Sequence, residues 1–422
     1  MVKLFPLAAL SVALLGIAPA HAAGITYLGK GSIPGNARDG SGLRGLLEDG
    51  VTPANQVGGL GSALAWSGRG DLYYATPDRG PADGATTYRD RLYAIEIRVK
   101  KTGPAKYGIQ PILRDTTLLR DEDKAFFTGS SAAFDATGST GSLRFDPEGI
   151  RVSRCGDTAF VSDEYGPYLY EFDLGSGKRV RAVGLPAKFG IDAPSAVVDE
   201  ELNRNVAGRQ TNRGMEGLAI SPDGSRLYGM MQNALLQDGG LDAANKRVGM
   251  NNRIVEIDTE SGAVREFVYV LDDKGNGVNE ILAINDHEFL VIERDGKAGA
   301  AAAFKKLYRI DASGATDVRA VKQLPAGALP ADIVPVAKAP FLDLLDPAFG
   351  LAGADFPEKI EAIAFGPDLD DGRHLLIVVN DNDFFADRAT HFYAFAIEPW
   401  VLPGFEAQRV GGSHRDCRHR RD

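Results

Sequence analysis

Residues 145–173 read FDPEGIRVSRCGDTAFVSDEYGPYLYEFD, and this stretch decides the fold class. Three short segments within it, 146–152, 158–162 and 168–172, are rich in β-branched and aromatic residues and are bounded by Gly, Pro or Asp. That pattern is typical of short antiparallel strands joined by tight turns. The stretch therefore predicts one small antiparallel sheet with charged residues at the ends of its strands.

Degenerate copies of this unit occur along the rest of the chain. They begin near Leu60, Gly214, Asn279 and Lys359, and each pairs an inner strand with a second strand before a third one follows. Modules of three or four short antiparallel strands that repeat in this way are the signature of a β-propeller. We therefore predict an all-β fold, a β-propeller with five legible blades.

Two features of the predicted propeller concern its closure. A sixth blade could lie within the long segments 98–143 or 312–357. The fifth module has no fourth strand before the end of the chain, and the isolated strand around Ile25–Leu28 could supply it. Such a strand would close the ring and remove its exposed sheet edge.

The two ends of the chain differ from the repeats. Residues 1–23 combine Lys3, an apolar run and a small-residue cleavage site, which predicts a cleaved signal peptide and a secreted or periplasmic protein. No later apolar run is long enough to cross a bilayer. We expect a propeller domain over residues 24–402 and a basic, flexible tail over residues 403–422.

The composition and net charge narrow the classes of molecule that the protein is expected to bind. The 50 glycines and 22 prolines suit a turn-rich β fold, and the formal net charge of −10 disfavours nucleic acid and anionic membranes. A monomer is the default expectation. Only two cysteines occur, Cys155 and Cys417, so an oxidising compartment permits one bridge between the tail and the second module, and two unpaired thiols are the alternative.

The candidate site is a ring of polar residues at the ends of the inner strands. Four inner strands begin with a glutamate at what looks like the same module position: Glu148, Glu216, Glu280 and Glu361, with Ser62 in that place in the first module. A second polar set ends the second strands: Asp78, Asp163, Glu164, Asn233, Glu293 and Asp381. If the modules align, both sets converge at the mouth of the central channel.

The carboxylates of such a ring repel one another unless positive charges neutralise them. Carboxylate and amide oxygens without cysteine ligands select a hard cation, Ca²⁺ before Mg²⁺, so both polar sets are candidate metal ligands. The four glutamates are also candidates for catalytic roles. Arg79, Arg213 and Arg294 lie between the acidic residues and are candidates for binding an anionic substrate, because guanidinium groups match phosphate and carboxylate oxygens.

Other catalytic motifs are missing from the sequence. It contains no G-x-S-x-G, no H-E-x-x-H and no G-x-x-x-x-G-K-[ST]. The few histidines give a Ser-His-Asp triad little basis.

The paired motifs resemble the phytase-like family, whose members are usually labelled "esterase-like activity of phytase family protein". The resemblance covers about residues 55–400. It rests on Gly59-Leu60-Gly61-Ser62 with Asp78-Arg79-Gly80, on Asp146-Pro147-Glu148-Gly149 with Ser162-Asp163-Glu164-Tyr165-Gly166, and on Met215-Glu216-Gly217-Leu218-Ala219, Asn279-Glu280 and Lys359-Ile360-Glu361-Ala362. The resemblance implies a secreted or periplasmic propeller that hydrolyses esters or phosphoesters. The ligand motifs of calcium-dependent propeller phytases do not match position by position, so phytate does not follow as the substrate.

Three functions fit these observations. The first is a metal-assisted hydrolase of phosphoric or related esters, with a small anionic ester as its partner. The second is a lactonase or carboxylesterase. The third is a non-catalytic extracytoplasmic binding propeller whose ring is structural.

Overall fold

The computed structural model describes residues 24–104, 106–133 and 143–411, which form five four-stranded antiparallel sheets. Three sheets are β2 (Ala63–Trp66), β3 (Leu72–Thr76), β4 (Arg91–Gly103) and β5 (Lys106–Leu118); β6 (Pro147–Val152), β7 (Thr158–Asp163), β8 (Leu169–Asp173) and β9 (Arg179–Ala182); and β10 (Met215–Ile220), β11 (Arg226–Met231), β12 (Asn251–Asp258) and β13 (Val264–Val270). The other two are β14 (Gly277–Ala283), β15 (Glu288–Arg294), β16 (Lys305–Asp311) and β17 (Ala337–Asp343); and β18 (Ile360–Phe365), β19 (His374–Asn380), β20 (Thr390–Ile397) and β1 (Ile25–Ile33).

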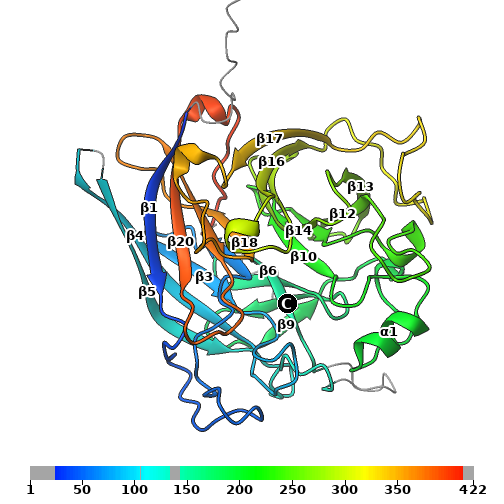
Figure 1. Cartoon of the computed structure of the whole chain (residues 1–422), viewed down its shortest axis with the longest axis horizontal. Coiled ribbons are helices and arrows are strands. Elements are labelled where there is room, and N and C mark those ends of the chain that lie inside the picture. Colours follow the sequence, from blue (N-terminus) through cyan, green and yellow to red (C-terminus); the bar gives the residue numbers. More distant parts are fainter. Residues whose placement is uncertain (1–23, 105, 134–142, 412–422) are drawn as a thin grey trace, which may run out of the picture.

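The five sheets are the blades of a β-propeller, as the sequence predicted. The inner strands β2, β6, β10, β14 and β18 each contact the next, and β18 contacts β2, so the ring is closed. Figure 1 shows β6, β10, β14 and β18 near the centre of the disc, with β1, β5, β13 and β17 farther out. The segments that could have held a sixth blade supply β4, β5 and β17 to the five existing blades.

The N-terminal strand closes the ring. β1 pairs antiparallel with β20, from Ile25 opposite Ile397 to Ile33 opposite Thr390. In Figure 1 the two strands run side by side although they come from opposite ends of the chain. The predicted closure is therefore confirmed, and the closing strand extends beyond the residues expected from the sequence.

Burial decreases from the hub to the rim of the propeller. Every residue of β6, β10 and β18 is buried, because each inner strand packs against the neighbouring blade on both faces. The outer strand β9 is exposed at Val180, Arg181 and Ala182. The hydrophobic core lies between blades, as where Ala63 of β2 clusters with Ile150 of β6. Packing between neighbouring blades therefore holds the inner strand ends in fixed positions.

A β-bulge interrupts four of the inner strands near their beginnings. The pairing shifts register at Glu148 in β6, Glu216 in β10, Asn279 in β14 and Glu361 in β18. A bulge leaves one residue outside the ladder and redirects its side chain. These four side chains are therefore equivalent, and they belong to the channel end at which the inner strands begin.

This register differs from the sequence expectation in the fourth blade. Glu280 was expected to be equivalent to the other three glutamates, but it pairs with Ile292 within the ladder, and Asn279 is the bulged residue. A shift of one residue along a strand moves a side chain to the other face. The alignment of glutamates by residue type could not detect this shift, since it depends on the position of the bulge.

The C-terminal segment crosses the opposite end of the channel. The backbone N–H groups of Glu406, Arg409 and Gly411 donate to the carbonyl oxygens of Ile284, Pro222 and Arg154, each at 2.8 Å. The first part of the expected flexible tail is thus hydrogen-bonded to three blades. Cys417 and residues 1–23 lie outside the described residues, so the bridge to Cys155 and the signal peptide stay predictions.

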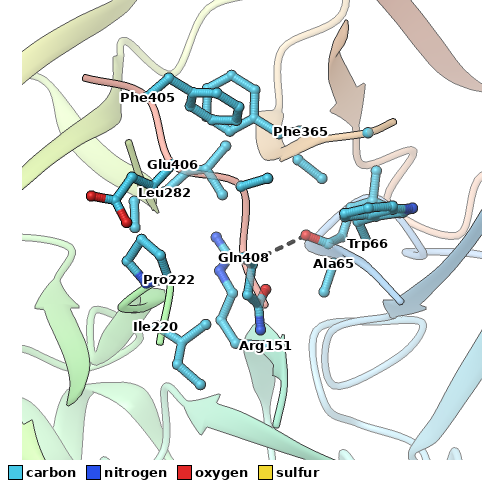
Figure 2. Close-up of a pocket in the computed structure, with 15 residues that line it drawn as sticks. Ala65, Trp66, Arg151, Ile220, Pro222, Leu282, Phe365, Phe405, Glu406 and Gln408 are labelled. Atoms are coloured by element: carbon cyan, nitrogen blue, oxygen red, sulfur yellow. Dashed lines mark hydrogen bonds between the residues drawn. The ribbon is translucent and has the colours of Figure 1, made fainter. Parts of the chain in front are cut away.

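A cavity of about 520 Å³, part of it open to solvent, lies beneath this C-terminal segment. Figure 2 shows its mostly apolar wall, with Phe365 and Phe405 side by side and Arg151 and Gln408 near the centre. The Arg151 guanidinium forms an ion pair with Glu280 at 3.0 Å. Among the described residues, no helix has the length and apolar character needed to cross a membrane.

Candidate functional site

A polar cavity of about 690 Å³, part of it open to solvent, lies at the channel end where the inner strands begin. We call it the mouth cavity. Its charged side chains are Asp78, Glu148, Glu164, Glu216, Glu358 and Glu361 together with Arg79, Arg213, Arg247, Arg294 and Lys359, and its amides are Asn212, Gln232 and Asn279. Carboxylates, guanidinium groups and amides therefore share one concave surface that belongs to all five blades.

The bulged residues meet in the mouth cavity. The Asn279 amide donates to Glu216 Oε1 at 2.8 Å and to Glu361 Oε1 at 3.5 Å. The Arg294 guanidinium also donates to Glu361 Oε1, at 2.5 Å. The bulges of three neighbouring blades thus bring their side chains into one hydrogen-bonded group.

Glu216 has one oriented oxygen and one without a partner. Its Oε1 accepts hydrogen bonds from the side-chain amides of Asn279 and Gln232. Its Oε2 has no hydrogen-bond partner among the described residues. Burial, followed by the nearby charges of Glu164 and Glu361, raises the pKa of Glu216 well above its ordinary value. The side chain is thus held in place, and its second oxygen is buried without a hydrogen-bond donor from the described residues.

Glu148 is a buried carboxylate without a neutralising partner. It is 7% exposed, and no hydrogen bond or ion pair joins its side chain to another described residue. Burial, and next the charge of Glu216, raises its pKa well above the ordinary value. One oxygen from each of Asp146, Glu148 and Glu164 lies within 4.8 Å of the other two.

The positive charge of Arg79 offsets part of the negative charge of this carboxylate group. Its Nη1 lies 2.6 Å from Asp146 Oδ2 and 3.2 Å from Glu164 Oε2, and its Nη2 lies 2.8 Å from Asp83 Oδ1. Burial, with a further contribution from Asp146, still raises the pKa of Glu164 to about 7. The predicted substrate-binding residue Arg79 lines the cavity, but three carboxylates already share its charge.

A second carboxylate group lies beside the first blade. Asp78, Asp381 and Asp383 offer oxygens within 4.8 Å of one another. The Lys359 ammonium lies 3.2 Å from Asp381 Oδ2 and 3.8 Å from Asp78 Oδ2, and it also contacts Asp383. Lys359 is therefore a built-in cation for this group.

Five predicted site residues lie outside the lining of the mouth cavity. One is Asp381, in the carboxylate group around Lys359, and two others fix local structure close to the cavity. Asp163 accepts hydrogen bonds from the backbone N–H groups of Asp146, Gly166 and Tyr168, so it shapes the turn after β7. Asn233 donates to the carbonyl of Asn276 at 2.9 Å.

The other two are Glu280 and Glu293. Glu293 accepts from Tyr269, Asn276 and Lys338 at 2.7 to 2.8 Å. Glu280 accepts from the backbone N–H of Leu218 at 3.1 Å and pairs with Arg151 below the cavity.

The predicted residues that the structure does bring together in the cavity are Asp78, Glu148, Glu164, Glu216, Glu361, Arg79, Arg213 and Arg294. Sequence reasoning did not single out Gln232, Arg247, Asn279 or Lys359. The register of the strand pairs could have found Gln232, which directly follows β11 as Glu164 directly follows β7. Arg247 comes from the loop between β11 and β12, which belongs to no repeat of the sequence.

The donor set of the mouth cavity fits a divalent cation. Asp146, Glu148 and Glu164 offer oxygen atoms only, and Glu148 has no donor or cation of the described chain beside it. Oxygen-only carboxylate groups suit hard cations such as Ca²⁺ and Mg²⁺. Because both carboxylate groups also contact a cationic side chain, the unpaired Glu148 is the residue that most needs such an ion.

A model of the phytase-like family, described as "esterase-like activity of phytase", matches residues 55–384. An uncharacterised secreted protein of Arthroderma benhamiae is 29% identical over 343 residues, which cover 63% of this chain and 66% of that protein's length.

Among solved structures, glutaminyl cyclase of Myxococcus xanthus is similar with a TM-score of 0.38 and 10% identity, over 88% of this chain and 97% of that one. Hydrazine synthase of Kuenenia stuttgartiensis has a TM-score of 0.36 and 14% identity, over 82% and 80% of the two chains. At these scores neither enzyme bears on the activity of this chain.

Proposed function

The chain belongs to the phytase-like family, and from this membership and the chemistry of the mouth cavity we propose that it is an exported, cation-assisted hydrolase of small anionic esters. The family itself suggests a hydrolase-type function. The finer assignment, to phosphoric or related esters, depends on the side chains of the cavity. We propose further that the protein is a secreted or periplasmic monomer that binds neither nucleic acid nor membranes.

The observation that carries the proposal is the arrangement of Glu216. Two amide groups fix its Oε1, and its Oε2 has no partner among the described residues. A general base needs a fixed orientation and a pKa near the working pH. Burial and the neighbouring carboxylates shift the pKa of Glu216 in that direction. In the proposed reaction Glu216 Oε2 takes a proton from a water molecule, whose oxygen attacks the phosphorus or acyl carbon of the ester. The bond from that atom to the alcohol oxygen breaks, and the alcohol leaves with the proton that Glu216 returns.

Glu148 and Glu164, with Asp146 beside them, would hold the divalent cation. A cation bound there polarises an ester oxygen and lowers the pKa of a bound water. We propose Ca²⁺ before Mg²⁺, because Ca²⁺ accepts several carboxylates at flexible distances whereas Mg²⁺ demands a near-ideal octahedron. Lys359 and Arg79 hold the remaining carboxylates of the cavity in place through their ion pairs.

The proposal is tested by hydrolysis of an aryl phosphate, an aryl acetate and a lactone with one preparation, with added Ca²⁺ and with excess chelator. We expect turnover of the aryl phosphate that requires the cation and is lost in Glu216→Gln. Glu260→Gln, in the exposed turn after β12 of the same blade, is the matched control and should keep full activity. Full activity of Glu216→Gln would overturn the role of Glu216.

The same panel separates the alternative functions. Turnover of the lactone or the aryl acetate in preference to the phosphate would make the protein a lactonase or carboxylesterase. A melting temperature that rises with Ca²⁺ but no turnover of any ester would make it a binding propeller with a structural ring.

A further inference from the structure

Three arginines line one part of the mouth cavity. Arg213 immediately precedes the third blade's inner strand, Arg247 comes from the loop between β11 and β12, and Arg294 ends β15 in the next blade. They come from three separate segments of two adjacent blades. Their convergence is thus a product of the fold and not of a local sequence pattern.

The three guanidinium groups differ from Arg79 in their partners. Arg294 pairs with the carboxylate of Glu361 at 2.5 Å. Arg213 donates to Gln232 Oε1 at 2.5 Å and to Asn233 Oδ1 at 3.0 Å, which are both neutral amides. The Arg247 side chain has no hydrogen bond or ion pair with another described residue. Among the described residues, neither Arg213 nor Arg247 therefore forms an ion pair with a carboxylate, although Glu164 and Glu216 lie near Arg213.

These two charges are costly in the free protein. Burial and the neighbouring Arg247 lower the pKa of Arg213 to about 10, and burial and Arg294 lower the pKa of Arg247. Both guanidinium groups remain protonated at neutral pH. Both side chains are partly buried, and Glu164 and Glu216 offset part of the Arg213 charge. Neighbouring charges of like sign still repel each other unless a ligand of opposite charge offsets them. Their retention at one site indicates an anionic ligand.

The charge and shape of the arginine group define the class of that ligand. A phosphate monoester carries close to two negative charges at neutral pH and presents oxygens that guanidinium forks bind in pairs. It would compensate both unpaired arginines at once. A lactone or a neutral carboxylic ester would leave both charges uncompensated.

We propose that Arg213, Arg247 and Arg294 form a subsite for a dianionic phosphoryl group, so that the substrates of this site are phosphate monoesters. Arg247 is the residue on which the subsite depends most, since it has no other described partner. The inference rests on the proposed function only in taking the bound group as part of a substrate. Binding of the phosphoryl group itself does not require that hydrolysis occurs.

The test is calorimetric titration of inorganic phosphate into the full chain, with chelator present so that no metal contributes. We expect one phosphate per chain in the wild type and binding weaker by about tenfold or more in Arg247→Gln, which removes charge-assisted hydrogen bonds. Arg247→Lys keeps the charge but loses the fork and should bind with intermediate strength. Acetate, a monoanion, should bind more weakly than phosphate to the wild type.

Arg265→Gln is the matched control, because Arg265 is exposed on β13 of the same blade. It should leave phosphate binding unchanged, and unchanged melting temperatures would show that the variants fold. Absence of phosphate binding by the wild type, equal binding by Arg247→Gln, or equal affinity for acetate would overturn the subsite.

The outcomes separate this inference from the proposed hydrolase. Phosphate binding that depends on Arg247, without turnover of any phosphate ester, would keep the subsite and overturn the hydrolase. Turnover that depends on Glu216, with no measurable binding of phosphate, would keep the hydrolase and overturn the subsite.

Discussion

The side-chain amide of Asn279 donates a hydrogen bond to Glu216 Oε1 at 2.8 Å, so that bulged residues of two neighbouring blades meet in the central channel. Asn279 also reaches Glu361 at 3.5 Å. An amide at this position orients two carboxylates that would otherwise repel each other. A fourth carboxylate in its place would add to that repulsion, which gives a physical reason for the single amide among the four bulged residues.

Asn279→Ala should therefore impair the orientation of the proposed base. We expect kcat for the cation-dependent substrate to fall by about tenfold or more, since a lost oriented hydrogen bond affects the transition state more than substrate binding. KM should change little. Steady-state kinetics on Asn279→Ala and on Asn203→Ala, a control on the exposed face of α1 (Val198–Arg204), measure the difference. Equal kcat values in the two variants would remove Asn279 from the site.

The buried carboxylates should make the stability of the cation-free protein depend on pH. Burial raises the pKa of Glu148 and Glu216 well above the ordinary value, that of Glu164 to about 7 and that of Asp381 to about 6. Because the folded state holds these protons more tightly than the unfolded state, the contribution is present at low pH. It is lost as the pH rises from about 4.5 through about 7.

We therefore expect the chelated protein to melt at a lower temperature at pH 8 than at pH 5. Added Ca²⁺ should raise the melting temperature more at pH 8, since the cation requires ionised ligands. Glu148→Gln removes one of the buried acids and should reduce both effects. A chelated wild type that is as stable at pH 8 as at pH 5 would contradict this account.

The ion pair below the mouth cavity should be structural. Arg151 is fixed by Glu280 at 3.0 Å and by the carbonyl oxygens of Leu64 and Ile281 at 3.0 and 2.8 Å. Arg151→Met would leave the Glu280 charge buried without its partner and should cost about 3–5 kcal/mol in the free energy of unfolding. Glu280→Gln should cost less, because the guanidinium keeps its carbonyl partners. Urea unfolding of both variants measures the asymmetry.

Hydrolysis provides the second measurement on this pair. Glu280 lies outside the mouth cavity, so Glu280→Gln should keep cation-dependent turnover at temperatures where it is folded. Loss of turnover in a folded Glu280→Gln protein would return Glu280 to the candidate catalytic set, where the sequence alone had placed it.

The sequence was sufficient to predict the architecture, because the repeated strands and the turns between them can be recognised from residue type. Short strands bounded by Gly, Pro and Asp recur five times, and the missing fourth strand of the last blade pointed to the N-terminal strand around Ile25. The confirmed pairing of Ile25 with Ile397 depends on backbone hydrogen bonds that any residue of β propensity can make. Pattern and composition alone therefore predicted the fold.

The site was less predictable, since it depends on single-residue register. Glu148, Glu216 and Glu361 were aligned as the structure has them, but Glu280 was aligned in place of Asn279, because a bulge leaves no trace in residue type. Arg247 comes from a loop whose path is set by tertiary contacts, and no repeat of the sequence includes it. Residues that are distant in the sequence and meet in one cavity can be recognised only in the three-dimensional structure.

The C-terminal segment should stabilise the propeller without taking part in its chemistry. The Phe405 ring packs against Phe365 and His374, with ring centres 4.5 and 4.4 Å apart, at the channel end opposite the mouth cavity (Figure 2). Because Phe405 is only partly buried, Phe405→Ala should lower the free energy of unfolding by about 1–3 kcal/mol, less than a fully buried phenylalanine would. Phe385→Ala, at an aromatic residue that is 46% exposed, should cost much less.

Since Arg151 and Glu280 lie between the two cavities, turnover and phosphate binding by the folded Phe405→Ala protein should equal those of the wild type. A change in either activity would show that the two ends of the channel are coupled, and would contradict a purely structural role.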